Sequence, residues 1–294
     1  MSHLLEGDIY MVPLIDVNWL TFAPFDPGRD FRVDPPKVEQ SVGETRALCE
    51  ILIDLTDGKC VLTPHSGTYC RSGYYEGEIM EVYKNCVAHG GELSIHLHEE
   101  IKGEGTRFAE YEHIRKVFLE CKKKYENAGL SANSYRGGHY AYAGFMNALL
   151  EEHGIYIDLS CLPGLSEQSR EAVWRNARFS GYYLPQDPRR EIDESVAISN
   201  VFEIPIGCDG LGTDYKNILH VEQSELENLQ RIWGVIARRA ETEGRPQIVY
   251  SLFHSGSMGR PEFVERYKRF LNFTTKNGGA FVTPSEAKNI FDER

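Results

Sequence analysis

The sequence predicts an α/β fold in which about seven parallel strands curl into a (β/α) barrel. Apolar, strand-like runs alternate with amphipathic, helix-like segments about seven times, the pattern of a parallel sheet with crossover helices. The strands are apolar throughout, as strands covered on both faces should be. No glycine-rich phosphate loop follows the first strand. A nucleotide-binding open sheet is therefore disfavoured, and a barrel is favoured.

The expected elements run along the chain without a linker or an internal repeat, so we expect one domain over 1–294. Several helices are followed by glycine, a common stop signal. A Pro- and Gly-rich loop is long enough to suggest a function, whereas 162–200 gives no clear element. Strands are expected at 9–16, 59–67, 92–98, 131–140, 155–161, 201–207, 247–256 and 280–287, helices at 38–56, 76–91, 107–129, 141–154, 222–244 and 261–279, and the loop at 21–36.

Composition narrows the classes of partner and the compartment. The net charge of −12 argues against nucleic acid and anionic membranes as partners. No run approaches the ~20 apolar residues of a membrane helix, and MSHLLEGDIY lacks the regions of a signal peptide. The seven cysteines are scattered, with no Cys-x-x-Cys pair, which fits a reducing compartment. We expect a cytoplasmic protein.

Unusual polar residues follow the expected strands. In a parallel barrel those strand ends share one face, where sites are built. A lone histidine at a strand end is more often an ordinary polar residue than a ligand, but so many at corresponding positions indicate a site. They are Asp16, Asn18, His65, His96, His98, Glu99, Glu100, Arg136, His139, Tyr140, Asp158 and His254.

The stretch GGELSIHLHEE ends a strand with two histidines one residue apart. Because side chains alternate along a strand, His96 and His98 point the same way. Two imidazoles on one face can hold one metal ion or one substrate. They can also be two polar residues at the mouth of a strand, and the spacing alone leaves these alternatives open.

The chain resembles the polysaccharide deacetylase superfamily, the NodB-homology carbohydrate esterases. The resemblance spans nearly the whole chain, and the matching stretches occur in the family's order. They are LIDVNW, GGELSIHLHEE, SYRGGHYAYAGFMNALLEEHGIYIDLSC, FEIPIG and LFHSGSMGRPEFVERYKRFLNFTTKNGGAFVTPSEA.

The resemblance implies a distorted (β/α) barrel of seven strands. It also implies a metal-dependent hydrolase that removes an N-acetyl, or less often an N-formyl or O-acetyl, group from a sugar. A Zn²⁺-like ion polarises the carbonyl and acidifies water, a carboxylate takes a proton, and an imidazole protonates the leaving amine.

Residue by residue, the resemblance assigns roles to the strand-end groups. Asp16 takes the place of the general base and His254 that of the general acid. Arg136 matches the arginine that orients the base, and Asp158 resembles the acidic partner of that arginine. His96 matches the first metal-binding histidine.

Two departures from the family pattern concern the metal. Val17 and Asn18 stand where the family has a second, metal-binding acidic residue. Asp16 would then have to bind the metal itself. Glu100 stands where the family's second histidine lies, and His98 is the favoured substitute because it shares a face with His96. The expected ligands are therefore Asp16, His96 and His98.

A third departure concerns the substrate, because His139 and Tyr140 replace a Pro and an aromatic residue. Expected substrate contacts are Asn18, His65, Glu99, Glu100, His139 and Tyr140. The expected substrate is a small acylated amino sugar, a nucleotide-sugar or a carrier-linked saccharide. Two alternatives stay open: another metal-dependent amidohydrolase on a β/α barrel, and a degenerate sugar-binding protein.

Overall fold

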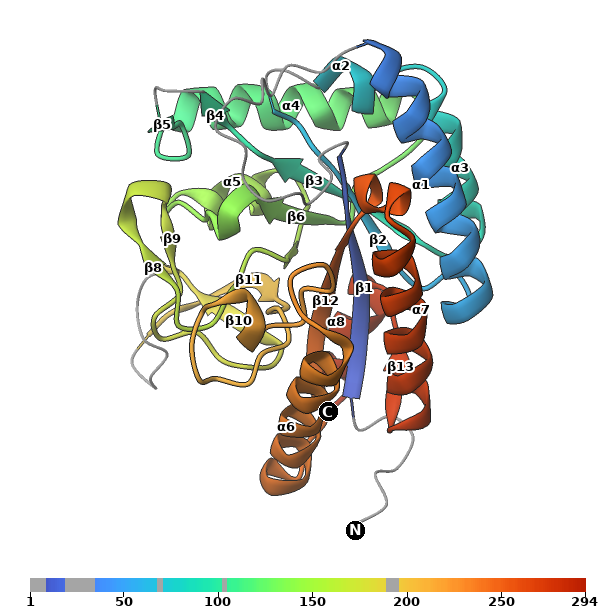
Figure 1. The fold of residues 1–294 in the computed structure, drawn as a ribbon. Helices are drawn as coiled ribbons and strands as arrows, with labels where there is room; N and C mark the ends of the chain where they lie inside the picture. Colours follow the sequence, from blue (N-terminus) through green and yellow to red (C-terminus); the bar gives the residue numbers. More distant parts are fainter. Residues whose placement is uncertain (1–8, 19–34, 68–70, 102–104, 189–195) are drawn as a thin grey trace.

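The computed structural model is a curved, mainly parallel sheet with helices outside it, and it describes residues 9–18, 35–67, 71–101, 105–188 and 196–294 (Figure 1). Seven strands run parallel in the order β11-β7-β6-β3-β2-β1-β12, the short β13 (Gly279–Phe281) also pairs parallel with β1, and β10 (Tyr182–Pro185) pairs antiparallel with β11. Seven parallel strands confirm the predicted α/β barrel class. The seven are β1 (Ile9–Val17), β2 (Val61–Pro64), β3 (Glu92–Leu97), β6 (Ser134–Gly137), β7 (Ile157–Asp158), β11 (Ile198–Glu203) and β12 (Gln247–His254).

The two ends of the sheet meet through the segment that follows β11. A parallel bridge joins Ile206 to Tyr250 of β12, and the Gly207 N–H donates to the Tyr250 carbonyl at 2.9 Å. Closure is made by these few contacts rather than by a long strand pair, so the barrel is distorted. It also brings the ends of β1, β6 and β12 to one mouth.

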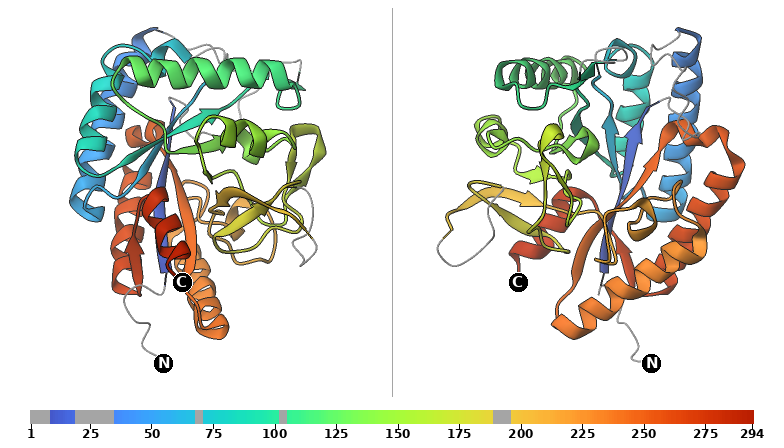
Figure 2. Two further views of the ribbon diagram at one scale, coloured as in Figure 1. Left: turned by 180° about the vertical axis from the view of Figure 1, so that it is seen from behind. Right: turned by 60° about the vertical axis from the view of Figure 1, so that its left-hand side comes forward.

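Helices cover the outside of the sheet in both views of Figure 2. Helix α7 begins with Pro261 at its first position, and α8 begins with a capping box between Thr283 and Glu286. Helix α6 ends at Gly244, which has φ +60°. The main helices are α1 (Pro35–Thr56), α3 (Ile79–Ala88), α4 (Tyr111–Asn127), α5 (Met146–Glu152), α6 (Leu226–Glu243), α7 (Pro261–Lys276) and α8 (Pro284–Asp292).

The core has two parts because strand side chains alternate. On β1, Val12 and Leu14 belong to a cluster inside the barrel, against which α8 packs, whereas Met11 and Ile15 belong to the cluster between sheet and helices. By the same alternation, Asp16 points to the inside, at the mouth. A buried apolar strand thus delivers a carboxylate to the end of the barrel.

Short elements lie mostly in stretches for which no clear element was predicted. The stretch predicted as irregular contains a small hairpin, and the expected loop 21–36 lies almost wholly outside the described residues. Among the described residues, no helix has the length and apolar character needed to cross a bilayer. The short elements are α2 (Arg71–Tyr74), β4 (Glu100–Ile101), β5 (Gly105–Thr106), η1 (Gly138–Tyr140), β8 (Ser166–Glu167), η2 (Gln168–Arg170), β9 (Ala172–Val173), η3 (Tyr215–Asn217), η4 (Ser255–Gly259) and β13 (Gly279–Phe281).

Candidate active site

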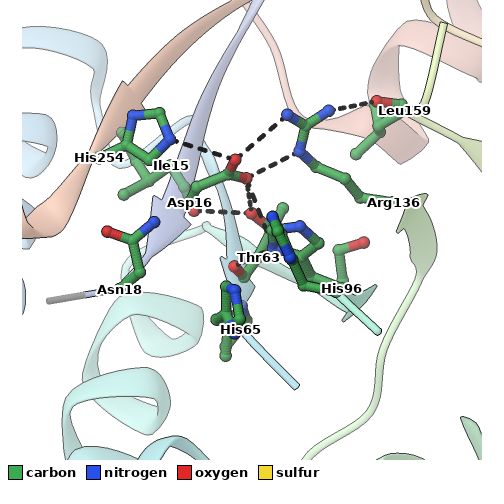
Figure 3. A network of polar contacts seen from close by, with 12 residues as sticks. Ile15, Asp16, Asn18, Thr63, His65, His96, Arg136, Leu159 and His254 are labelled. Atoms are coloured by element: carbon green, nitrogen blue, oxygen red, sulfur yellow. Dashed lines mark hydrogen bonds and ion pairs between the residues drawn. The ribbon is translucent and has the colours of Figure 1, made fainter. Parts of the chain in front are cut away.

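Asp16 lies at the centre of the barrel mouth, where β1 is flanked by β12 and β2. The strand register places it beside His254 on one side and Thr63 on the other. The Thr63 hydroxyl donates to Asp16 Oδ1 at 2.5 Å, and His254 Nε2 lies 3.5 Å from Oδ2. Asp16 is 5% exposed. The carboxylate is therefore buried and held from several sides (Figure 3).

Arg136, at the end of β6, is the cation that neutralises this carboxylate. Its Nε donates to Asp16 Oδ1 at 2.7 Å and its Nη2 donates to Oδ2 at 3.2 Å. Its Nη1 donates to the Leu159 carbonyl at 2.9 Å and to the Tyr250 hydroxyl at 3.0 Å. Burial alone would raise the pKa of Asp16, but the charge and hydrogen bonds of Arg136, together with His96 and His254, outweigh it and hold that pKa well below its usual range. Asp16 is thus kept ionised.

The turn after Arg136 depends on two glycines. A Cβ on Gly137 would lie 1.8 Å from the Ala141 carbonyl oxygen, and one on Gly138 would lie 2.5 Å from His98 Cδ2. Only residues without side chains allow this close approach. The turn places His139 and Tyr140 at the mouth, both with positive φ, at 51° and 62°.

Gly137→Ala is expected to lower the free energy of unfolding by about 1–3 kcal/mol, the usual cost of overpacking. The backbone carbonyl that a Cβ would meet cannot rotate away as a flexible side chain would. Chemical denaturation measures the loss. Gly144→Ala is the matched control, because a Cβ there meets nothing within 4 Å. Equal stabilities for the two variants would contradict the close-approach argument.

His96 presents an unused nitrogen to the interior. Its Nδ1 lies 3.1 Å from the Thr63 carbonyl, which can only accept, so Nδ1 carries the proton. Nε2 then holds a lone pair, and it is buried without a hydrogen-bond partner among the described residues. Burial lowers the pKa of His96 to about 4. A neutral imidazole with a free Nε2 is the form that binds a metal.

Three further histidines pack beside His96. The rings of His65 and His98 stack with centroids 4.2 Å apart, and His139 meets His98 at 4.6 Å. The Gly67 N–H donates to His65 Nδ1, which leaves the proton of His65 on Nε2. Burial and the neighbouring imidazoles lower the pKa of both His65 and His98. His65 and His98 are thus held in the neutral form, and the cluster is rich in nitrogen.

Glu222 and His220 lie against His254 but were not among the predicted site residues. Glu222 Oε1 accepts from the His254 backbone N–H at 2.6 Å and lies 3.1 Å from His254 Nδ1. His220 Nδ1 lies 3.2 Å from Glu222 Oε2, and the His220 and His254 rings stack. Burial raises the pKa of Glu222, but the two histidines outweigh it and lower that pKa to about 2. Glu222 therefore fixes the His254 ring so that Nε2 faces Asp16.

The alternating pattern His220-Val221-Glu222 has the same spacing as His96-Leu97-His98 and could have been noticed. The expected helix over 222–244 would begin at Glu222, whereas α6 begins at Leu226. Periodicity misses such residues because they lie in the irregular path from β11 to α6.

The structure brings most predicted residues to the mouth, but two point elsewhere. Glu99 is buried and contacts Ser66 at 3.0 Å and His113 of α4 at 2.6 Å, so it braces the strand end rather than facing the mouth. Asp158 lies on the outer face of the sheet, level with Tyr135. The expected contact with Arg136 is made instead by the carbonyl of the next residue, Leu159.

Asn18 and Glu100 are two other predicted substrate contacts, and the structure describes the side chain of Asn18 alone. Asn18 is 7% exposed, and its Oδ1 has no hydrogen-bond partner among the described residues. The Asn18 N–H donates to Ser255 Oγ at 3.1 Å. The side chain of Glu100 lies outside the described part of the chain.

The types of donor atom at the mouth suit a divalent cation. His96 Nε2 and Asn18 Oδ1 are buried acceptors without partners in the described structure, and His96 Nδ1 lies 3.6 Å from Asp16 Oδ1. Nitrogen and carboxylate donors suit Zn²⁺, whereas an amide oxygen adds little. Both carboxylate oxygens of Asp16 already accept hydrogen bonds from Arg136. The three expected ligands, Asp16, His96 and His98, are therefore not gathered tightly.

A second group of donors is tighter. Within the described residues, the set with all ligand atoms within 4.8 Å of one another is His220, Glu222 and His254. Its carboxylate, however, already accepts the His254 N–H and faces an Nδ1 of each histidine. Oε1 is thus held by the backbone and the ring of His254, whereas Oε2 has its charge contact with His220 but no hydrogen bond among the described residues.

No protein-family model matches the sequence, and no curated protein matches it. Solved structures do match. A protein from Parabacteroides distasonis assigned as a glycoside hydrolase/deacetylase has a TM-score of 0.67 at 13% identity, over 100% of this chain and 73% of that chain. One from Mycobacterium smegmatis assigned as a polysaccharide deacetylase has a TM-score of 0.61 at 15% identity, over 100% of this chain and 93% of that chain.

A third match is PuuE allantoinase, with a TM-score of 0.59 at 14% identity over 98% of this chain and 91% of that chain. Identities this low compare folds and not activities. The agreement covers the whole chain and extends to the distorted barrel. The chain therefore has the fold of the polysaccharide deacetylase superfamily, which its sequence motifs had indicated.

Proposed function

We propose that the chain is a metal-dependent hydrolase that removes an N-acetyl or N-formyl group from an amino sugar or glycan precursor. The observation that carries the proposal is the buried pair of Asp16 and His254, 3.5 Å apart at the barrel mouth. Each has its own charged partner, Arg136 for the base and Glu222 for the acid. A protein that only bound sugar would need neither of these oriented pairs.

Asp16 and His254 carry out different proton transfers in the reaction. Asp16, kept ionised by Arg136, accepts the proton of the attacking water. His254, whose Nδ1 is held by Glu222, directs Nε2 toward the mouth and delivers a proton to the leaving amine. Burial at the mouth keeps bulk water away from both.

Asp16, His96 and His98 would hold the cation. When bound, a Zn²⁺-like ion supplies Lewis acidity, which polarises the acyl carbonyl and makes water more acidic. The orientation of His96, with Nδ1 on the Thr63 carbonyl, leaves Nε2 ready for this role.

A small, soluble substrate suits the chain. We propose an acylated monosaccharide, a nucleotide-sugar or a carrier-linked saccharide, used in the cytoplasm. The described cysteines are all buried free thiols, which fits a reducing compartment. The net charge of −12 would repel polyanionic polymers and tolerate a product with a new ammonium group.

The experiment is a substrate panel with the metal content measured in parallel. Purified protein is loaded with Zn²⁺, dialysed and analysed for metal, then offered N-acetylated and N-formylated monosaccharides, nucleotide-sugars and chitin-like polymers. We expect about one metal ion per chain and release of acetate or formate from a small substrate. Absence of both metal and acyl release would overturn the proposal, and a strong preference for long polymers would overturn the substrate class.

Non-sugar amides belong in the same panel, because PuuE allantoinase shares the fold. This second candidate is an amidohydrolase of the same mechanism acting on a different leaving group. Turnover of a non-sugar amide with none of any sugar would favour it.

The position of the metal is testable apart from activity. His96→Ala with His98→Ala is expected to abolish stoichiometric Zn²⁺ binding, measured by elemental analysis, while the protein stays folded. Glu222→Gln is the matched control and should keep the metal, because Glu222 is not one of the proposed ligands and its Oε1 is already held by His254. The opposite result, with metal lost only in Glu222→Gln, would move the site to His220, Glu222 and His254.

A further inference from the structure

A second pair of acidic residues lies on the outer face of the barrel wall. Asp158 ends β7 and Glu203 ends β11, and the strand register sets them side by side. Both are fully buried. Each has one carboxyl oxygen that is buried without a hydrogen-bond partner among the described residues. Neither belongs to the mouth, where Asp16 and His254 would act.

The hydrogen bonds of the pair leave room for one proton. Asp158 Oδ1 accepts from the Ser160 hydroxyl at 2.6 Å, and Glu203 Oε1 accepts from the Cys161 N–H at 3.1 Å. The other two oxygens, Oδ2 and Oε2, have no hydrogen-bond partner among the described residues, so a shared proton is what would join them. Two carboxylates cannot hydrogen bond without a shared proton, and two adjacent buried negative charges are costly.

The pair is joined to Arg136 through the segment that follows Asp158. The Ser160 hydroxyl, which donates to Asp158, accepts from the Gly137 N–H at 2.7 Å. Between them, the Leu159 carbonyl accepts from Arg136 Nη1 at 2.9 Å (Figure 3). The segment around Leu159 is thus held by Asp158, through the Ser160 hydroxyl, and by Glu203, through the Cys161 N–H.

We propose that Asp158 and Glu203 share one proton and act as a single positioning unit, which sets the Leu159 carbonyl, through it Arg136, and through Arg136 the base Asp16. The inference rests on the proposed function for the role of Asp16. It also reassigns Asp158 from a direct partner of Arg136 to an indirect one. Glu203 is a positioning residue that the sequence motifs do not mark.

The surroundings favour the protonated pair. Burial raises the pKa of Asp158 to about 6, and burial together with the Asp158 charge raises the pKa of Glu203 well above its usual range. One cation, Arg136, acts on Glu203 from inside the barrel. The other titratable groups that face the pair are neutral at neutral pH: Tyr135, Tyr142, Cys161, Tyr182 and Tyr250.

The sign of the pH effect follows. A carboxyl whose pKa is raised by folding loses stability as the pH rises from its unfolded value, about 4, through its folded value. When the shared proton leaves, the two ionised groups repel each other and release the segment around Leu159. Activity should therefore fall on the alkaline side together with stability.

The test compares amide and alanine variants of Glu203. Glu203→Gln keeps an acceptor for the Cys161 N–H and supplies permanent hydrogens to Asp158. We expect wild-type kcat at neutral pH, loss of this alkaline decline, and a flatter dependence of unfolding free energy on pH. Glu203→Ala removes both contacts and should lower kcat by about 10- to 100-fold at unchanged KM, the effect of a small misplacement. If Glu203→Gln does not fold, Asp158→Asn tests the same shared proton.

Glu92→Gln is the matched control. Burial also raises the pKa of Glu92, but its carboxylate accepts from Ser285. Its pH–rate profile should match wild type. Identical profiles of kcat and of unfolding for wild type and Glu203→Gln would overturn the inference.

A measurement without turnover separates this inference from the proposed function. Amide hydrogen exchange of the peptides containing Gly137 and Cys161 should accelerate with rising pH more in wild type than in Glu203→Gln, beyond the intrinsic rate. If the wild type is inactive but shows this difference in exchange, the proposed hydrolase function is wrong and the proton-sharing pair is supported. An active wild type without the difference would remove the pair.

Discussion

Replacing Arg136 with methionine is expected to cost about 3–5 kcal/mol of unfolding free energy and to abolish turnover. The reason is that removing one member of a buried ion pair leaves the other uncompensated. Asp16 and Arg136 are 5% and 3% exposed and joined by two hydrogen bonds. Chemical denaturation and an assay on the best substrate of the panel measure the two losses.

The double variant with Asp16→Asn and Arg136→Met sharpens the test, because it removes both charges. We expect it to regain part of the stability lost by Arg136→Met and none of the activity. Arg46→Met is the matched control, since Arg46 pairs with Glu78 at an exposed site and should cost less than about 1 kcal/mol. A double variant less stable than both single variants would show that the pair does not act as a charge pair.

The pH dependence of the same variant has a definite sign. In wild type the pKa of Asp16 lies well below its usual range. Its ionised form therefore contributes stability above the unfolded pKa of about 4, and this contribution is lost only as the pH falls. Without Arg136, burial dominates and raises that pKa. The stability deficit of Arg136→Met should then grow between pH 5 and pH 8, and a constant deficit would contradict this account.

Most of the barrel and part of the site follow from sequence because both depend on strand periodicity. The apolar run of β1 and the glycine that closes α3 are local signals. The ends of parallel strands must share one face, so Asp16, Arg136 and His254 could be placed together before their contacts were known.

The misplaced residues show what periodicity leaves undetermined. Asp158 ends a strand only two residues long, and a shift of one position decides whether a side chain points in or out. The resemblance favoured the inside, but Leu159 occupies it. Glu99 points to α4 because Ser66 and His113 offer it donors, and both lie far from it in sequence. Contacts between distant segments are set by the packed fold and not by local pattern.

The path between β11 and α6 was not predicted in its irregular course, and it carries Glu222. Its course depends on isolated bridges, such as the one between His220 and Leu252, rather than on a regular strand. Such bridges carry no repeating signal in the sequence. The residue that orients His254 could therefore be recognised only from the assembled barrel.

His254→Ala is expected to lower kcat by about 10²–10⁴-fold, the usual contribution of a positioned proton-transfer group. Glu222→Gln should lower kcat by about 10- to 100-fold, because it replaces a charged hydrogen-bond acceptor with a neutral one. If Glu222 acts only by orienting His254, adding Glu222→Gln to His254→Ala should cause no further loss. Steady-state kinetics on the three variants measure this coupling, with thermal unfolding to confirm that each is folded.

Glu225→Gln is the control for a nearby change from Glu to Gln. Its carboxylate pairs with Arg266 at the surface and touches neither His254 nor Asp16, so kcat should stay at the wild-type value. A double variant clearly slower than His254→Ala would mean that Glu222 has a second role, for which its contact with His220 is the available route. Full activity in His254→Ala would remove the imidazole from proton transfer, and the contacts of Glu222 would then serve only the packing of the barrel mouth.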